Sequence, residues 1–333
     1  MIAKPHHALL WILAVSMGAL LVAPFLGMQS ISPVAALGAG LPETLAQILY
    51  SIRIPRCLLA YLAGGALALG GLVLQALFQN LLASPFTLGV ASGAAFGTAL
   101  YFTLGFNFAI LGVGGGSIFG IGGAVVTIVP IFLLARRRLS PTEVLLAGVV
   151  LSMFFSSLVM FIQYLSDYTG ILRITRWLMG GFDVVGYQAV LGIAPFTILG
   201  ALVVQSNSAR LNLMALGDDL ATARGVNVRR VKPLLILAVS LMIGAVVSFC
   251  GPISSVGIMA PHICRLLVGL DHRRLIVATF AGGGALVLVC DTLARTVIAP
   301  YEIPVGVITA LLEGPFFLWL LYARRWARTE VLA

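Results

Sequence analysis

Long apolar runs separated by short polar segments make up most of this chain. A run of about 20 apolar residues is long enough to cross the hydrocarbon core of a bilayer as a helix, and the sequence contains nine such runs. These predicted spans lie near residues 8–28, 57–78, 88–104, 109–135, 144–165, 187–205, 233–250, 275–294 and 305–323. The first run is too long for the apolar core of a signal peptide, so it is predicted to be an uncleaved span.

A tenth apolar piece, 254–267, is too short to cross as a straight helix, and the basic residues indicate whether it crosses. If the N-terminus is inside and only nine runs span, the 20 Lys and Arg residues divide evenly between the two sides. If the short piece also crosses, 15 of the 20 fall on the inside. Cytoplasmic loops carry such an excess of basic residues. The charge pattern therefore predicts ten spans with both termini in the cytoplasm.

The segment GPISSVGIMAPH at the start of this tenth piece predicts broken backbone at membrane depth, because it contains two glycines and two prolines. Such backbone is tolerated only where protein or water covers it, which indicates a bundle around a cavity. The chain also contains 37 glycines, many of them in pairs or triplets. They are consistent with a cavity, or with close helix packing through small residues.

Composition supports a membrane protein and excludes several other classes. The chain is 60% hydrophobic and only 9% charged, whereas soluble domains carry about 25% charged residues. No polar stretch is long enough to fold separately, so residues 1–333 are predicted to form one all-α transmembrane domain. The net charge of +9 needs no nucleic-acid partner, since basic residues collect at the cytoplasmic face. The four cysteines form no CxxC pair and are predicted to be small buried residues, without a metal site.

The longest polar loop, 206–232, is predicted to fold into two short helices with the shape of an elbow. Leu211 and Met214 share one face of the first helix at a spacing of three residues. Three residues are predicted to break, begin and end the helices: Gly217, Asp218 and Gly225. A surface loop without a partner is one interpretation. We favour an elbow that is presented to a partner.

Few charges are predicted to lie outside: Arg53, Arg56, Arg173, Arg176 and Arg295. Arginines at such positions bind lipid headgroups, or form a fork for the carboxylates of a partner protein. Both interpretations stay open from the residues alone.

Two carboxylates, Asp291 and Glu313, lie in or near predicted spans, where ionisable groups are functional candidates. They raise the alternative of an ion-coupled secondary transporter. No buried basic partner is evident for either, and Asp291 lies four residues before Arg295, which favours a helical ion pair near the outer surface.

Two enzyme classes receive little support. ATP hydrolysis at a P-loop needs a lysine after glycine, but Lys4 follows Ala and Lys232 follows Val. If ATP is used, another chain binds it. A serine hydrolase would need Ser92 with His262 or His272 as base, and a serine among small residues is typical of helix packing.

Several motifs resemble those of FecCD-type permeases, the membrane subunits of binding-protein-dependent ABC importers for iron–siderophore complexes, haem and cobalamin. The segment RIPRCLLAYLAGGALALGGLVLQALFQNLLASPFTLGVASGAAFG is similar to the family pattern R-x-P-R … G-x-x-L-Q … N-P-L-A-x-P-x-x-L-G. The later motifs follow in family order: LLAGVVLS, LNLMALGDDLATARGVNV, GPISSVGIMAPHICRLLVGLDHRRL and YEIPVGVITALLEGPFFLWLL. The resemblance covers nearly the whole chain.

The resemblance implies a type II importer permease fold: a homodimer of ten-span subunits in the bacterial or archaeal inner membrane. It further implies two ABC ATPase subunits, which would hold ATP and Mg²⁺, an extracytoplasmic substrate-binding protein, and no cofactor in this chain. The elbow, about 207–230, would contain the coupling helices, with contacts to the ATPase from Leu213, Leu216, Gly217, Asp218, Asp219, Ala223 and Gly225. The binding protein would dock on Arg53, Arg56 and Arg295. The cytoplasmic gate would contain Asn80, Leu82, Pro141 and Thr142.

Two positions depart from the family pattern. Leu81 replaces the proline of N-P-L-A, which predicts a different backbone at the gate, and Ser255 replaces an aromatic residue beside the broken segment. The predicted function is the permease subunit of an ATP-driven importer. An iron–siderophore complex is the first expectation for its cargo, with haem, cobalamin and oxyanions as alternatives.

Overall fold

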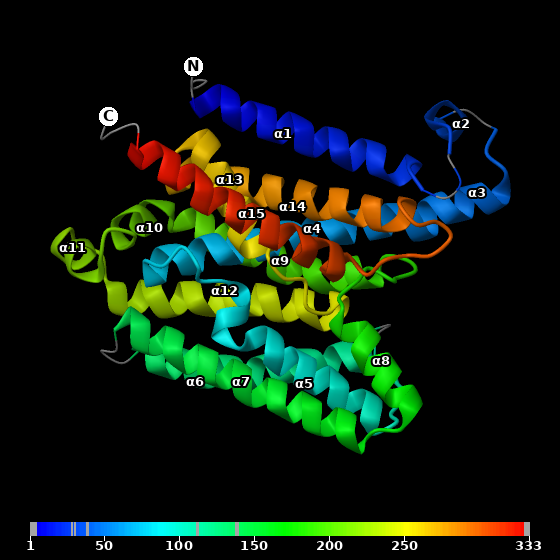
Figure 1. Ribbon diagram of the computed structural model, residues 1–333, viewed down its shortest axis with the longest axis horizontal. Helices are drawn as coiled ribbons and strands as arrows, with labels where there is room; N and C mark the ends of the chain where they lie inside the picture. The colour runs from blue at the N-terminus through cyan, green and yellow to red at the C-terminus, as the bar shows by residue number, and fades with distance from the viewer. Residues whose placement is uncertain are drawn as a thin grey trace.

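A computed structural model describes residues 5–27, 29, 31–37, 40–110, 113–136 and 140–329, which form a helical bundle (Figure 1). The α-helices are α1 (Pro5–Val22), α2 (Pro33–Leu37), α3 (Glu43–Gln47), α4 (Ile54–Phe78), α5 (Val90–Thr103), α6 (Gly115–Arg136), α7 (Pro141–Leu165), α8 (Tyr168–Leu178), α9 (Gln188–Ser206), α10 (Ser208–Met214), α11 (Asp218–Ala223), α12 (Val228–Cys250), α13 (Val256–Val268), α14 (His272–Thr296) and α15 (Val305–Thr329). Short 3₁₀ turns occupy Ala23–Phe25 and Pro85–Leu88, a π-helical turn occupies Ile48–Arg53, and β1 (Ala109–Ile110) pairs antiparallel with β2 (Val113–Gly114).

Each of the ten predicted apolar segments contains a long or short helix, and three features differ from the prediction. Residues 109–110 and 113–114 form two short paired strands instead of starting a span. The amphipathic helix α8 was not predicted. The second span is longer than its apolar run, because Glu43–Phe78 is continuously helical. Among the described residues, seven helices are long and apolar enough to cross a membrane, so the count of ten spans stays a prediction.

The elbow helices lie at one end of the bundle, which we call the elbow end (Figure 1). Helix α1 begins there and α15 ends there, whereas α3 and α8 lie toward the opposite end. Helix α12 leaves the elbow and reaches the opposite end, where the carbonyl of Cys250 accepts from the N–H of Gly181 at 2.8 Å. Helix α13 carries the chain back, and Asp271 contacts the elbow. The cluster Arg265–Arg274 and the elbow therefore share one end, as the charge pattern predicts.

The irregular segment Gly251–Ser255 separates α12 from α13, as its glycine and proline content predicts. Gly251 and Ser255 have positive φ values of 69° and 73°. Protein covers this backbone: a Cβ at Gly251 would overlap the carbonyl of Trp177, and one at Gly180 would overlap that of Pro252. Because irregular backbone needs such cover at membrane depth, this segment can lie inside the bundle.

Close contacts between glycines bring α4 against α13 and α14. A Cβ added to Gly64 would overlap the carbonyl oxygen of Gly283 on α14, and one added to Gly71 would overlap that of Gly257 on α13. Of the two interpretations of the glycine clusters, these positions support close packing through small residues.

We expect Gly71→Ala to destabilise the protein by roughly 1–3 kcal/mol, the usual cost of inserting a methyl group into a packed interior. Gly122→Ala is the matched control, since nothing lies within 4 Å of a Cβ there; it should be neutral or stabilising by up to about 1 kcal/mol. Thermal unfolding of the detergent-purified protein measures both. Equal unfolding midpoints would show that the α4–α13 contact is not tight.

Candidate functional site

Three of the outward-predicted arginines lie together at the end of the bundle opposite the elbow, and two of them bind one buried carboxylate. Arg56 on α4 donates from Nε to Asp291 Oδ1 at 2.9 Å, and Arg295 donates from Nε to Asp291 Oδ2 at 3.0 Å. Asp291 is fully buried. The predicted pair Asp291–Arg295 is confirmed, and Arg56 is a buried basic partner that was not evident from the sequence.

Arg53 lies in the same cluster, and its guanidinium holds the turn that follows α1. It donates to the carbonyl oxygens of Pro24 at 3.3 Å and Gln29 at 2.6 Å. Gly27 gives it room, since a Cβ there would lie 2.7 Å from Arg53 Nη2. The three arginines are therefore buried and bonded within the chain, rather than standing free at the surface.

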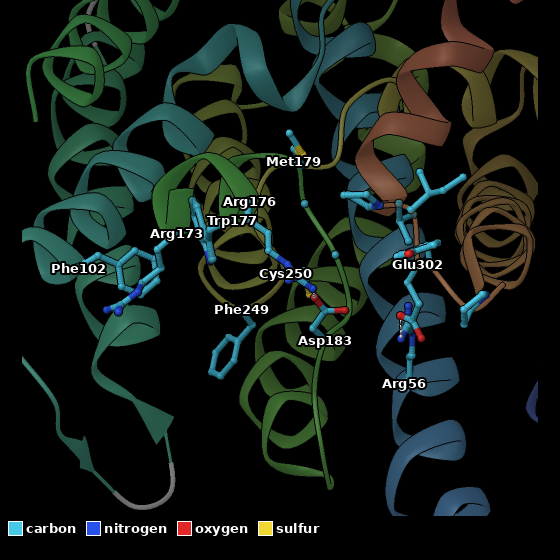
Figure 2. A pocket seen from close by; sticks show the side chains of 17 residues that line it. Arg56, Phe102, Arg173, Arg176, Trp177, Met179, Asp183, Phe249, Cys250 and Glu302 are labelled. Atoms are coloured by element: carbon cyan, nitrogen blue, oxygen red, sulfur yellow. Dashed lines mark hydrogen bonds and ion pairs between the residues drawn. The ribbon is translucent and has the colours of Figure 1, made fainter. Parts of the chain in front are cut away.

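Glu302, in the loop between α14 and α15, is the solvent-facing member of the cluster. Its Oε2 accepts from Arg56 Nη1 at 2.7 Å, and its side chain is 41% exposed (Figure 2). Three guanidinium groups face two carboxylates in this cluster, so one positive charge is in excess. We call these residues the arginine cluster: Arg53, Arg56, Asp291, Arg295 and Glu302.

Two cavities meet at the arginine cluster. The larger, of about 760 Å³, is lined by Arg56 and Glu302 together with Arg173, Arg176 and Asp183 (Figure 2). The smaller, of about 300 Å³, is lined by residues of the cluster and of the turn after α1: Gly27, Gln29, Ile48, Ile52, Arg53, Arg56, Arg295 and Glu302. Of the residues that the structure describes, only Arg56 and Glu302 line both cavities.

The elbow folds as the sequence predicts, with one correction. Helices α10 and α11 are the two short helices, Leu211 and Met214 are buried, and Gly217 and Gly225 have φ values of 128° and 84°. The predicted cap role of Asp218 is wrong. Its side chain makes no capping bond; instead Asp218 Oδ2 accepts from Lys232 Nζ at 2.6 Å, which ties α11 to α12.

One asparagine fastens the elbow to α14. Asn212 Oδ1 accepts from the backbone N–H of His272 at 2.9 Å, and its Nδ2 donates to Asp271 Oδ1 at 2.9 Å. The pKa of Asp271 lies below its usual value, because the Asn212 amide and the backbone N–H of Arg273 donate to the carboxylate. The elbow thus contacts the first turn of the helix whose other end carries Asp291.

The predicted coupling residues divide into exposed and half-buried groups. Leu216 is 68% exposed, and Asp219, Ala223 and Gly225 are also exposed. Leu213, Gly217 and Asp218 are half-buried. Leu220 on α11 is 57% exposed and was not among the predicted contacts. The elbow therefore buries one apolar face and presents Leu216 and Leu220.

The predicted gate residues lie at two turns. Gln79 ends α4 in a left-handed conformation, and the backbone N–H of Leu82 donates to Asn80 Oδ1 at 2.9 Å. This turn forms without the family proline. Leu82 and Thr142 are exposed, and Pro141 begins α7, although its side chain lies outside the described residues. The gate role stays a prediction.

Three of the remaining candidate groups, Glu313, His272 and His262, contact other side chains of the bundle. Glu313 accepts a hydrogen bond from the hydroxyl of Ser255, the residue that replaces an aromatic side chain. His272 contacts Asn212, and the His262 ring packs edge-on against Phe316. Ser92 lines a small cavity between α5 and α7. This arrangement does not support a serine hydrolase. All four cysteines are buried and free, as predicted.

The profile of the FecCD transport family matches residues 8–323. The chain belongs to the FecCD transport family. It is 38% identical to the hemin transport system permease HmuU of Yersinia pestis over 285 residues, covering 84% of each chain. It is also 38% identical to the vitamin B12 import system permease BtuC of Klebsiella pneumoniae subsp. pneumoniae over 281 residues, 83% of each chain.

The fold of this FecCD protein also matches a solved structure. A metal-chelate type ABC transporter in an inward-facing conformation superposes with a TM-score of 0.85 at 32% identity, covering 95% of this chain and 98% of the other. The predicted family resemblance is thereby confirmed.

Sequence reasoning missed two residues of this FecCD protein that join distant segments. Glu302 reaches Arg56 across 246 positions, and Asn212 reaches His272 across 60. The sequence showed only that each is a polar residue among apolar ones, Glu302 in YEIP and Asn212 in LNLM. Neither motif indicates which residue is its partner.

We expect Asp291→Asn to destabilise the protein by roughly 3–5 kcal/mol, because it leaves two buried guanidinium groups without their shared countercharge. Asp183→Asn is the control: Asp183 pairs with Arg176 at 3.4 Å on the exposed surface, and such pairs contribute about 0–1 kcal/mol. Thermal unfolding in detergent measures both variants. A similar loss in both would contradict a structural role for the buried carboxylate.

Proposed function

We propose that this FecCD protein is the membrane-spanning permease subunit of an ATP-driven, binding-protein-dependent importer. The observation that carries the proposal is the family match over nearly the whole chain, combined with a folded elbow that presents Leu216 and Leu220. A separate ATPase subunit would bind ATP and Mg²⁺, since neither lysine of this chain follows glycine as a P-loop requires.

The proposed assembly is a homodimer of ten-span type II subunits in the inner membrane, with both termini in the cytoplasm and two ATPase subunits on the elbows. The shared position of the elbow, the start of α1 and the end of α15 supports this orientation (Figure 1). ATP-driven closure of the ATPases would move the elbow, and Asn212 would pass the movement to α14.

The extracytoplasmic binding protein is proposed to dock at the arginine cluster. The excess positive charge of the cluster would attract acidic side chains of the binding protein. Charge-assisted hydrogen bonds between carboxylates and arginine are strong and directional. The buried bonds of Arg53 and Arg295 suggest that they maintain the shape and charge of the site. Arg56, which lines both cavities, is the candidate for direct contact.

The proposed cargo is an iron–siderophore complex or a related bulky chelate such as haem or cobalamin. The names of HmuU and BtuC, and the metal-chelate type transporter of similar fold, support this class. Binding of ferric siderophores, haem and cobalamin to the purified binding protein encoded beside the permease gene would identify the cargo. Absence of any such gene, and of an ATPase gene, would favour a transporter that works alone.

Ion-coupled transport is the weaker candidate. Asp291 would be its main proton or sodium site, but both carboxylate oxygens accept from arginine side chains. A proton or sodium ion that binds Asp291 would therefore have to displace an arginine from the carboxylate.

The proposed orientation predicts opposite labelling of two exposed positions, Val185 and Leu270, each 75% exposed. Val185→Cys should react with a membrane-impermeant maleimide in intact cells, whereas Leu270→Cys should react only after permeabilisation. The native cysteines are buried, and the unsubstituted protein serves as the control. Labelling of Leu270→Cys from outside would contradict the orientation.

The elbow is expected to anchor the ATPase through Leu216. Leu216→Ala should weaken the association by about 1–3 kcal/mol, as truncation of an interface anchor does, and should reduce transport. Gly225→Val should add to the loss, because a β-branched residue resists the positive φ of Gly225. Co-purification with the ATPase and cargo uptake measure the effect.

Leu270→Ala is the control for the elbow variants, since it truncates an exposed leucine outside the elbow but beside Asp271, which contacts the elbow. It should leave association and uptake unchanged. Normal uptake and normal ATPase association in the Leu216→Ala, Gly225→Val double variant would contradict a coupling role.

A further inference from the structure

We propose that Glu302 occupies the place of a partner carboxylate, and that docking of the binding protein exchanges Glu302 on Arg56 for an acidic side chain of that protein. The inference rests on the proposed docking function and names the contact that changes. It starts from a single bond: Arg56 Nη1 donates to Glu302 Oε2 at 2.7 Å.

The two carboxylates on Arg56 differ in how easily they can be replaced. Asp291 is fully buried and shared with Arg295, so removing it would expose two buried charges to a medium that does not solvate them. The Glu302 side chain is 41% exposed, whereas that of Arg56 is 8% exposed, so water competes for Glu302 but not for Asp291. An incoming carboxylate can therefore displace Glu302, while Asp291 keeps Arg56 in position.

The position of the pair makes it accessible from two sides. Arg56 and Glu302 line both the cavity of about 760 Å³, which Figure 2 shows, and the cavity of about 300 Å³. A side chain that enters either cavity meets this pair. When Glu302 leaves, the remaining cluster has three guanidinium groups and one carboxylate, which favours replacement by another anion.

The exchange would also alter a contact between helices. Glu302 lies three residues before α15, in a loop that is fastened to α14 by the N–H of Ile303 donating to the carbonyl of Ala294 at 3.1 Å. The Arg56–Glu302 bond joins this loop to α4. Loss of the Arg56–Glu302 bond would remove this link between α4 and the loop before α15, while the bond to α14 remains. Docking would therefore change how α15 is held in the bundle.

The test compares Glu302→Gln with Asp183→Asn. Both variants remove one negative charge from the lining of the larger cavity, but Asp183 pairs with Arg176 and not with Arg56. Glutamine retains an acceptor oxygen for Arg56 and so preserves the loop. The affinity of the variants in nanodiscs is measured for the purified binding protein encoded beside the permease gene, at low ionic strength, where surface electrostatics are strongest.

Exchange predicts that Glu302→Gln tightens binding by roughly two- to fivefold, because the competing ion pair is removed, and that Asp183→Asn has no such effect. An equal gain in affinity in both variants would show that the overall electrostatic potential of the cavity causes the change, and it would overturn the exchange. Unchanged or weaker binding by Glu302→Gln, with an unchanged unfolding midpoint, would overturn it as well.

The docking function is tested separately by Arg56→Lys, which keeps a positive charge beside Asp291 but loses the bidentate fork. If Arg56→Lys weakens binding while Glu302→Gln leaves it unchanged, docking at Arg56 stands and the exchange is wrong. If the unsubstituted permease does not bind the protein at all, the proposed docking function itself is wrong.

Discussion

The close packing of α4 against α14 is the contact on which the rest of this structure depends. Glycines such as Gly64 and Gly283 let the two backbones approach, and the carboxylate of Asp291 on α14 accepts from Arg56 on α4. Because no water solvates a charge that is buried among apolar helices, such a charge is tolerated only when it is paired with an opposite one. The pairing therefore constrains the register of α4 on α14, and α1, α9, α12 and α13 pack around this pair.

Helix α14 connects the two candidate sites of the protein. Its first turn contacts Asn212 of the elbow, and its last turns carry Asp291 and Arg295. Helices α6, α9, α12, α13 and α15 each contain a proline, where helices kink, whereas α14 contains none. A single 25-residue helix thus links the elbow to the arginine cluster. Movement of the elbow would be passed to the cluster along this one helix.

Each of the two candidate sites contains buried residues that hold the fold together and exposed residues that face solvent. In the arginine cluster, Arg53 and Arg295 hold the turn after α1 and the shared carboxylate, whereas Glu302 reaches solvent. In the elbow, Leu211 and Met214 are buried while Leu216 is exposed. In both places the buried groups keep the exposed ones in position. The exposed residues of both sites are therefore the candidates for contact with a partner.

The sequence by itself determined the helical membrane class, the approximate position of each long helix, the two glycine-broken helices of the elbow and the family. These properties depend on local composition, on backbone preferences such as the positive φ at Gly217 and Gly225, and on motifs read in order. Only the tertiary structure decided which residues meet. Arg56 and Asp291 are 235 positions apart, and Asp218 pairs with Lys232 instead of capping its own helix. Where spans are apolar on nearly every face, periodicity does not reveal which face packs inward, so long-range partners follow from the packing alone.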